Sequence, residues 1–228
     1  QEVRTDEQIG KVSIVGAGHE VGCHGDLHQR ANTMTGPEFR ADLRAARASI
    51  EDAAGKPVAS YRAPEWSLRT TSSPHLPTLV EEGFRLDSSL LAVPPIGDVA
   101  NPVRPTLLHT SAGDLLEVPP LVGTFFGRPA MLGGGWTSRL SREARVTAAA
   151  EESLARGQSP VFYLHPWEVD DEHPPMDLPP VARLVHFDGH NVAGGKSFET
   201  FVDEQVAVDF GRIGLGPAGR ALVIDSVD

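Results

Sequence analysis

Strand-like and helix-like stretches alternate along this chain, and this alternation constrains its fold more than any other feature. The clearest helix is predicted over residues 35–54, where Thr35 and Glu38 form a capping box and apolar residues recur at helical spacing. Gly55 ends this helix. Strands that alternate with helices usually lie parallel in one sheet. The sequence therefore predicts an α/β fold built from βα units.

The same alternation continues through most of the chain. Strands are expected at residues 20–23, 58–62, 84–87, 115–118 and 161–164, and helices at residues 74–83 and 141–156. Beyond residue 180 the pattern weakens to a helix at 198–210 and a short strand at 221–224. We therefore expect one βα domain over residues 1–180 and a carboxyl-terminal extension over residues 181–228 that packs on it.

Composition limits the classes of function. The chain has 228 residues, enough to bury the core of one large domain. Its net charge of −11, without a basic stripe, argues against nucleic acid as a partner. No window is apolar enough to predict membrane insertion. The first ten residues lack the apolar stretch of a secretory signal, which slightly favours the cytoplasm and leaves the cell envelope open.

The cysteine content narrows the kinds of site. Cys23 is the only cysteine, so neither an intrachain disulfide nor a zinc site with several thiolates is available. A cysteine in a predicted strand is expected to behave as a small buried apolar group. The chemistry of this chain must therefore come from other side chains.

Polar side chains follow several of the predicted strands. They are His24 and His28, Arg62, Asp87 and His165. Because the carboxyl ends of parallel strands form one face, we expect these side chains to meet there. The two histidines, four residues apart, suit two ligands of one zinc ion, although loop histidines bonded to backbone or water are an equal alternative. A catalytic zinc also needs a third protein ligand.

Six segments add a stronger signal. They are GHEVGCHGDLH at 18–28, YRAPEWS at 61–67, LDSS at 86–89, LLEVPP at 115–120, GGGW at 133–136 and FYLHPWE at 162–168. In this order they resemble the polysaccharide deacetylase family, the NodB-homology carbohydrate esterases, and most closely its branch associated with bacterial exopolysaccharide loci. The resemblance implies a distorted parallel (β/α) barrel. It also implies removal of N-acetyl groups from an amino-sugar polysaccharide or oligosaccharide.

The resemblance implies a role for each matched residue. His24 and His28 match the family's metal ligands, which implies a divalent cofactor, with zinc expected, and a metal-activated water as the nucleophile. His165 matches the general acid that protonates the departing amine. Arg62 matches the arginine that orients the catalytic carboxylate, and Asp87 falls in the motif whose carboxylate lies near the catalytic histidine.

Aromatic residues in these motifs are expected to bind substrate. The resemblance implies a groove shaped by Tyr61, Pro64 and Trp66. Trp136 and Trp167 are candidates for stacking on a sugar ring, although packing in the core is an equal alternative for both.

One family motif has no counterpart in this chain. Members carry an early strand that ends in an acidic pair, which supplies the catalytic base and the third metal ligand, and nothing ahead of Gly18 matches it. We therefore expect a barrel that is incomplete at its amino-terminal strands, in a chain lacking part of its amino terminus. Asp225, which follows the predicted strand 221–224, and Asp26 are two alternatives for the missing carboxylate.

Two consequences of the missing motif remain open. An incomplete barrel exposes a strand edge, so self-association is expected unless another segment fills the gap. The leading function, a metal-dependent N-deacetylase, also has rivals. These are a catalytically incompetent carbohydrate-binding module and a deacetylase fragment whose metal site is only structural.

Overall fold

The computed structural model describes residues 15–16, 18–125, 127–134, 141, 143–163, 165 and 222–224. The chain forms two compact units, one of residues 1–119 and 220–228 and one of residues 120–219. The predicted domain boundary at residue 180 lies outside the described residues, so that division stays a prediction.

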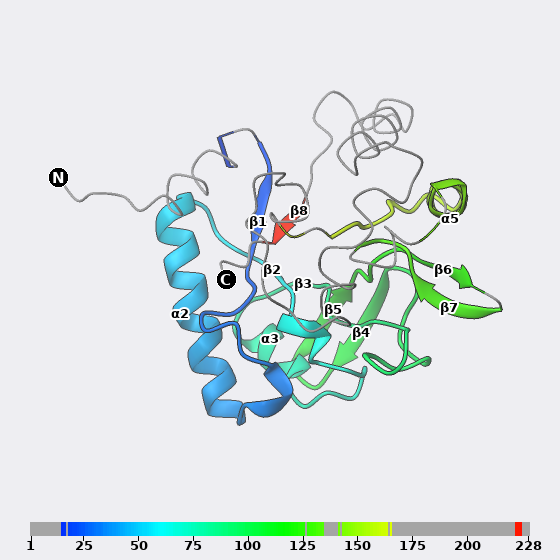
Figure 1. Ribbon diagram of the computed structural model, residues 1–228. Helices are drawn as coiled ribbons and strands as arrows, with labels where there is room; N and C mark the ends of the chain where they lie inside the picture. Colours follow the sequence, from blue (N-terminus) through cyan, green and yellow to red (C-terminus); the bar gives the residue numbers. More distant parts are fainter. Residues whose placement is uncertain are drawn as a thin grey trace, which may run out of the picture. The chain divides into compact units, whose positions relative to one another are not determined.

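The first unit is built around parallel strands. Its strands are β1 (Glu20–Gly22), β2 (Ser60–Tyr61), β3 (Leu86–Asp87), β4 (Thr106–Thr110), β5 (Gly113–Glu117) and β8 (Leu222–Ile224). Parallel pairs join β8 to β1, β2 to β3 and β3 to β5, and a parallel bridge joins Cys23 to Tyr61 (Figure 1). Strand β4 pairs antiparallel with β5. The predicted α/β class is confirmed, and this strand order is compatible with a segment of the expected barrel.

The predicted long helix is confirmed as α2 (Gly36–Ala54). The hydroxyl of Thr35 accepts a bond from the backbone N–H of Glu38, whose carboxylate accepts from the backbone N–H of Thr35, as the capping box predicts. Gly55 adopts φ +65°, the left-handed conformation in which glycine ends helices. Shorter helices are η1 (Ala31–Thr33), η2 (Pro64–Trp66) and α3 (Leu76–Glu81). Helix α3 begins two residues later than predicted, because Pro74 and His75 belong to a preceding turn.

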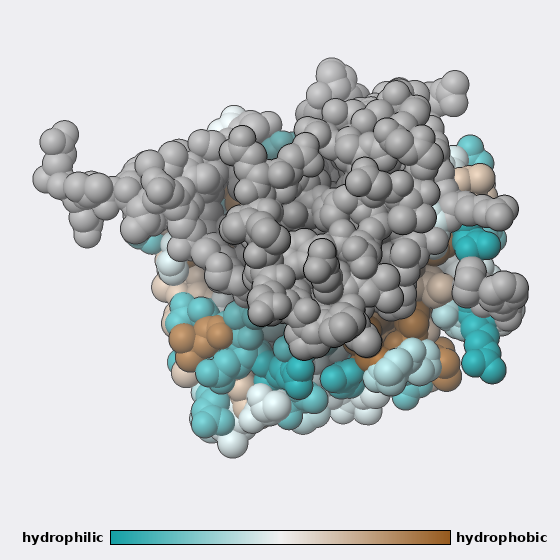
Figure 2. All heavy atoms as spheres, viewed as in Figure 1, coloured by the Kyte–Doolittle hydropathy of each residue, from teal (hydrophilic) through white to brown (hydrophobic). Residues whose placement is uncertain are grey.

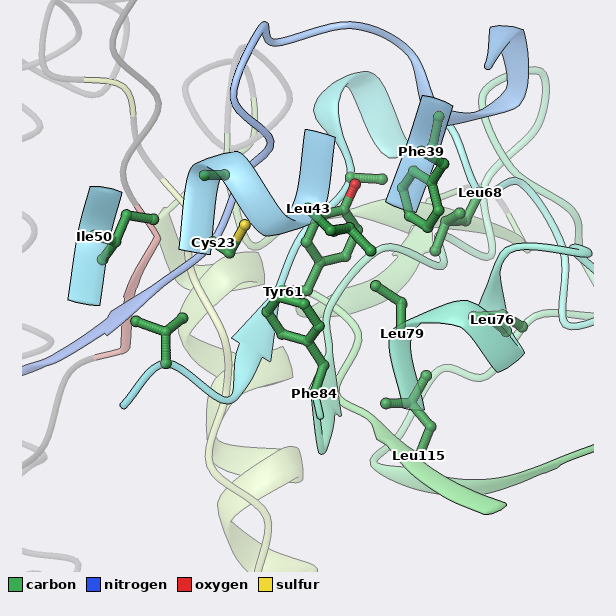
Figure 3. Packing of buried hydrophobic residues seen from close by; sticks show 14 of the residues in the cluster. Cys23, Phe39, Leu43, Ile50, Tyr61, Leu68, Leu76, Leu79, Phe84 and Leu115 are labelled. Atoms are coloured by element: carbon green, nitrogen blue, oxygen red, sulfur yellow. The ribbon is translucent and has the colours of Figure 1, made fainter. Parts of the chain in front are cut away.

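The core of this unit lies between α2 and the strands. Figure 3 shows Phe39 and Leu43 of α2 facing Tyr61, with Phe84 beneath. The ring of Tyr61 lies 5.9 Å from that of Phe39 and 5.8 Å from that of Phe84. Burying each large apolar side chain stabilises the fold by about 1.5–3 kcal/mol. Cys23 is fully buried in this cluster, as expected.

The second unit contains a hairpin and a helix. Strands β6 (Val122–Phe125) and β7 (Arg128–Met131) pair antiparallel, and α5 spans Glu143–Ala155. The predicted strand at 161–164 is present in its described residues as a single parallel bridge between Gly134 and Tyr163. The predicted helix at 198–210 lies outside the described residues.

The surface of the described residues is mixed in character. On the face shown in Figure 2, hydrophobic residues form small patches among hydrophilic ones. Within the described ranges, no helix has both the length and the apolar character that crossing a bilayer requires.

Candidate functional site

The loop after β1 places two histidine rings side by side. Their centroids are 5.1 Å apart, and the Nδ1 atom of His24 lies 2.6 Å from the carbonyl oxygen of Arg62. Because a carbonyl oxygen only accepts, this bond requires a hydrogen on Nδ1 of His24, which in a neutral ring leaves the lone pair on Nε2. A backbone bond of this kind fixes the tautomer and orientation that a metal-binding imidazole needs.

A carboxylate of α2 holds this loop in shape. Asp42 Oδ1 accepts hydrogen bonds of 3.1 Å from the backbone N–H groups of both Asp26 and Leu27. A Cβ atom added at Gly25, where φ is +89°, would lie 3.0 Å from Asp42 Oδ2. Asp42 was not predicted as a functional residue. The sequence pattern that could have indicated it is a carboxylate on the face of α2 whose other buried residues are apolar.

The histidine pair fits part of a metal site. Two imidazoles on one loop are a suitable ligand pair for zinc. Among the residues that the structure describes, no three His, Cys, Asp or Glu side chains are grouped closely enough to hold an ion. Asp26 therefore does not complete a set of three, and Asp225 lies outside the described residues. The metal site stays a prediction.

Arg62, at the end of β2, is held by the segment that follows β3. Its Nε donates to the carbonyl oxygen of Ser88 at 3.1 Å and its Nη2 donates to Ser88 Oγ at 2.8 Å. Its guanidinium carbon lies 5.0 Å from the ring centroid of Trp66, in a cation–π arrangement. His24, Arg62 and Trp66 thus lie together at the ends of β1 and β2.

The backbone around these residues is strained. In the described part of the chain, four residues other than glycine have positive φ, namely His28, Glu65, Trp66 and Arg69. Such conformations cost about 1–3 kcal/mol each and tend to gather at functional sites, where packing holds them in place. Pro64 and Trp66 are buried within η2, and Tyr61 is buried in the core. Tyr61 therefore contacts Phe39 and Phe84, and its predicted contact with substrate stays a prediction.

Asp87 lies beside a second carboxyl group, that of Glu117. The two residues pair in register on β3 and β5, and both are fully buried. Burial raises the pKa of Asp87 to about 6, against the effect of the Ser89 hydroxyl that donates to it. Burial, and then the charge of Asp87, raise the pKa of Glu117 well above its ordinary value. Glu117 was not predicted as a functional residue. It could have been, because it stands two residues after Leu115 in a strand and therefore points to the same buried face.

The second unit carries the remaining predicted residues. His165 is half-buried, with its ring 5.8 Å from that of Tyr163. The backbone N–H of Tyr163 donates to the carbonyl oxygen of Gly133 at 2.7 Å, so Tyr163 lies beside Gly133 and Gly134. Trp136 and Trp167 lie outside the described residues. His165 belongs to the second unit and the histidine pair to the first, so the prediction that His165 faces the pair stays a prediction.

Family models match most of the chain in two consecutive segments. The polysaccharide deacetylase model matches residues 8–76, and the model described as a domain of unknown function (DUF3473) matches residues 88–206, just over half of the chain. The chain belongs to the polysaccharide deacetylase family. The first model contains the histidine pair and Arg62, and the second contains Glu117 and His165.

Individual relatives are more distant. The peptidoglycan deacetylase of Helicobacter pylori is 36% identical over 78 residues, which are 34% of this chain and 26% of that protein. The chain thus spans about a quarter of the length of this curated relative. A structure from Mycobacterium smegmatis assigned as a polysaccharide deacetylase is 20% identical, with a TM-score of 0.48 over 97% of this chain and 70% of that chain. A probable polysaccharide deacetylase from Pseudomonas aeruginosa is 15% identical, with a TM-score of 0.42 over 69% and 50%. At these TM-scores the structural similarities add nothing to the family assignment.

Proposed function

We propose that this chain is a metal-dependent hydrolase that removes N-acetyl groups from an amino-sugar polysaccharide. The observation that supports it best is the contact of His24 with the backbone of Arg62, whose guanidinium is itself held by Ser88. The same chain of hydrogen bonds thereby orients two side chains: the His24 imidazole, which is suited to bind a metal, and the Arg62 guanidinium, which is suited to bind a carboxylate. Membership of the polysaccharide deacetylase family agrees with this chemistry.

In this proposal His24 and His28 hold a divalent ion, with zinc expected. An ion held there would supply Lewis-acid polarisation of the acetyl carbonyl and a bound water of lowered pKa. Arg62 presents a rigid fork of donors that orients the carboxylate acting as base. His165 donates a proton to the nitrogen of the departing amino sugar. Trp136 and Trp167 offer aromatic faces on which sugar rings can stack, and Trp66, buried beside Arg62, shapes the groove.

The substrate class follows from two similarities. The closest resemblance of the six motifs is to the exopolysaccharide-locus branch, so we propose an exopolysaccharide of N-acetylated amino sugars as the substrate. The named activity of the Helicobacter relative makes the peptidoglycan glycan strand the alternative to test. Both are polymers of N-acetylated sugars, and parallel assays on the two decide between them.

The decisive experiment measures acetate release from acetylated glucosamine oligomers, with and without added zinc. We expect release only with the metal, and its loss in His24→Ala and His28→Ala together with loss of zinc retained on dialysis. His109→Ala is the matched control, because His109 is exposed on β4 and pairs with Asp114. Oligomer binding without acetate release would favour the carbohydrate-binding module. Zinc that raises only the melting temperature would indicate a structural site.

The general acid has its own test. We expect His165→Ala to lower kcat on the order of 10²–10⁴-fold, the usual contribution of a general acid, while zinc binding is unchanged. Equal turnover in the variant and the unaltered chain would remove His165 from the mechanism.

A further inference from the structure

Asp87 and Glu117 form a buried carboxyl pair that the proposed mechanism does not explain. The two residues lie in register on neighbouring strands, both without solvent exposure, and among the described residues each keeps one carboxyl oxygen without a donor. Two ionised carboxylates in this position would repel each other in a medium of low dielectric constant. One of the two carboxyl groups is therefore expected to be neutral.

Only two of the four carboxyl oxygens of the pair have a hydrogen-bond donor in the described part of the chain. Asp87 Oδ1 accepts from the hydroxyl of Ser89, and Glu117 Oε1 accepts from the backbone N–H of Leu90 at 3.1 Å. In the described part of the chain, no group donates to Asp87 Oδ2 or to Glu117 Oε2. Carboxylates only accept, so a hydrogen bond between the two groups requires that one of them be protonated. One proton supplies the missing donor and removes one charge.

The carboxyl pair also supports the contacts that hold Arg62. Ser89, whose hydroxyl donates to Asp87, accepts from the backbone N–H of Ala63 at 2.8 Å. Ser88 accepts both bonds from the Arg62 guanidinium and donates to the carbonyl oxygen of Val118 at 2.6 Å. Segment 88–90 thus connects the carboxyl pair to the segment that carries Arg62.

We propose that Asp87 and Glu117 share one proton and act as a single positioning unit for Arg62. The meaning of this unit for catalysis rests on the proposed function, since it acts through Arg62. The described groups with a charge effect on Asp87 are Arg62, which favours its ionised form, and Glu117, while Tyr61 lies next to Asp87 in register on β2. Asp87 has the nearby cation and the hydroxyl donor, so the proton resides mainly on Glu117.

Nuclear magnetic resonance tests the shared proton directly. Carbon-13 signals of the side-chain carboxyl groups are followed across pH and assigned with Asp87→Asn and Glu117→Gln. We expect one carboxyl of the pair to keep its proton at neutral pH, and Glu117→Gln to remove that signal. Asp114→Asn, an exposed position on the same strand, is the matched control and should leave it unchanged. Two ionised signals at neutral pH would overturn the proposal.

The positioning role has a separate readout, the Nε–H signal of Arg62. Glu117→Gln supplies an amide donor to Asp87, so we expect slow exchange of this hydrogen with solvent to be retained. Glu117→Ala removes the carboxyl that shares the proton with Asp87. Ser89→Ala removes only the hydroxyl that joins Asp87 to the backbone of Ala63, which is a milder change. In either variant that folds, exchange should become faster on the order of tenfold, as for loss of one hydrogen bond. Unchanged exchange in folded Ser89→Ala and Glu117→Ala would end the positioning role. Failure of the unaltered chain to release acetate would instead contradict the proposed function, because neither spectrum depends on turnover.

Discussion

At the scale of single residues, Asp42 is the side chain that keeps the histidine loop in its shape. We expect Asp42→Ala to destabilise the chain by about 1–3 kcal/mol, because the backbone N–H groups of Asp26 and Leu27 lose their acceptor. Zinc affinity should fall on the order of 10–100-fold, as for other residues that orient metal ligands. Urea unfolding and zinc titration measure the two effects.

The matched control lies on the same helix. Asp52 is exposed on α2, so Asp52→Ala should leave zinc affinity unchanged. Asp42→Asn keeps one acceptor oxygen and should lie between the two alanine variants. Equal zinc affinity in all three would show that the loop does not depend on Asp42.

Glu117 makes stability depend on pH in a particular direction. Its pKa is raised in the folded chain, so the folded state keeps a proton that the unfolded state releases. Stability from this group is therefore fully present below the unfolded pKa and falls as pH rises towards the folded pKa, by about 1.4 kcal/mol per pH unit. Glu117→Gln should flatten urea-unfolding stability between about pH 5 and pH 7. The same slope in variant and unaltered chain would mean that Glu117 does not hold the proton.

Candidate site residues could be proposed from the sequence where a polar group directly follows a strand. His24 and Arg62 were chosen in this way, because strand ends converge in parallel architecture. Asp42 and Glu117 were missed because each is a polar residue on a face whose other buried residues are apolar. Only packing reveals that Asp42 accepts hydrogen bonds from a loop 15 residues away and that Glu117 lies in register beside another carboxyl.

At the scale of elements, the amino terminus of α2 allows a clean test of capping. Thr35→Ala removes the oxygen that accepts from Glu38 N–H, and we expect a loss of about 1 kcal/mol in urea unfolding. Thr35→Ser should restore most of this loss. Ser49→Ala, on an exposed position in the middle of the same helix, is the control and should change stability by less. A full loss in Thr35→Ser would assign the effect to the threonine methyl group.

Helix α2 was predictable and the two hairpins were not. Capping box, apolar spacing and terminal glycine all indicate the same boundaries for α2. Strand β4 carries Leu107 half-exposed opposite Leu116, so it lacks the alternation that marks a half-buried strand. Such hairpins form because each strand pairs with a neighbouring strand. The local sequence of β4 or β6 does not indicate which strand that neighbour is.

At the scale of the whole molecule, the pairing of β8 with β1 joins residues about 200 positions apart. The strand at 221–224 was predicted from its apolar run, and a segment filling the open edge was the stated condition for avoiding self-association. Glu20 pairs with Leu222 and Gly22 with Ile224, so β8 covers the edge of β1 that lies away from β2. Local patterns cannot choose such a partner, because any edge strand offers the same backbone groups.

This pairing predicts how the chain behaves when β8 is removed. A variant that ends at Gly219 leaves the backbone N–H and C=O groups of β1 unpaired on one side, and such edges pair with other chains. We expect its apparent mass in size-exclusion chromatography with light scattering to rise with concentration. A variant that ends at Ile224 keeps β8 and is the matched control, so its mass should not change with concentration. If both variants stay monomeric over the same range, β8 does not protect the edge of β1. If both associate, the interface lies elsewhere, and the open-edge explanation fails for the full chain as well.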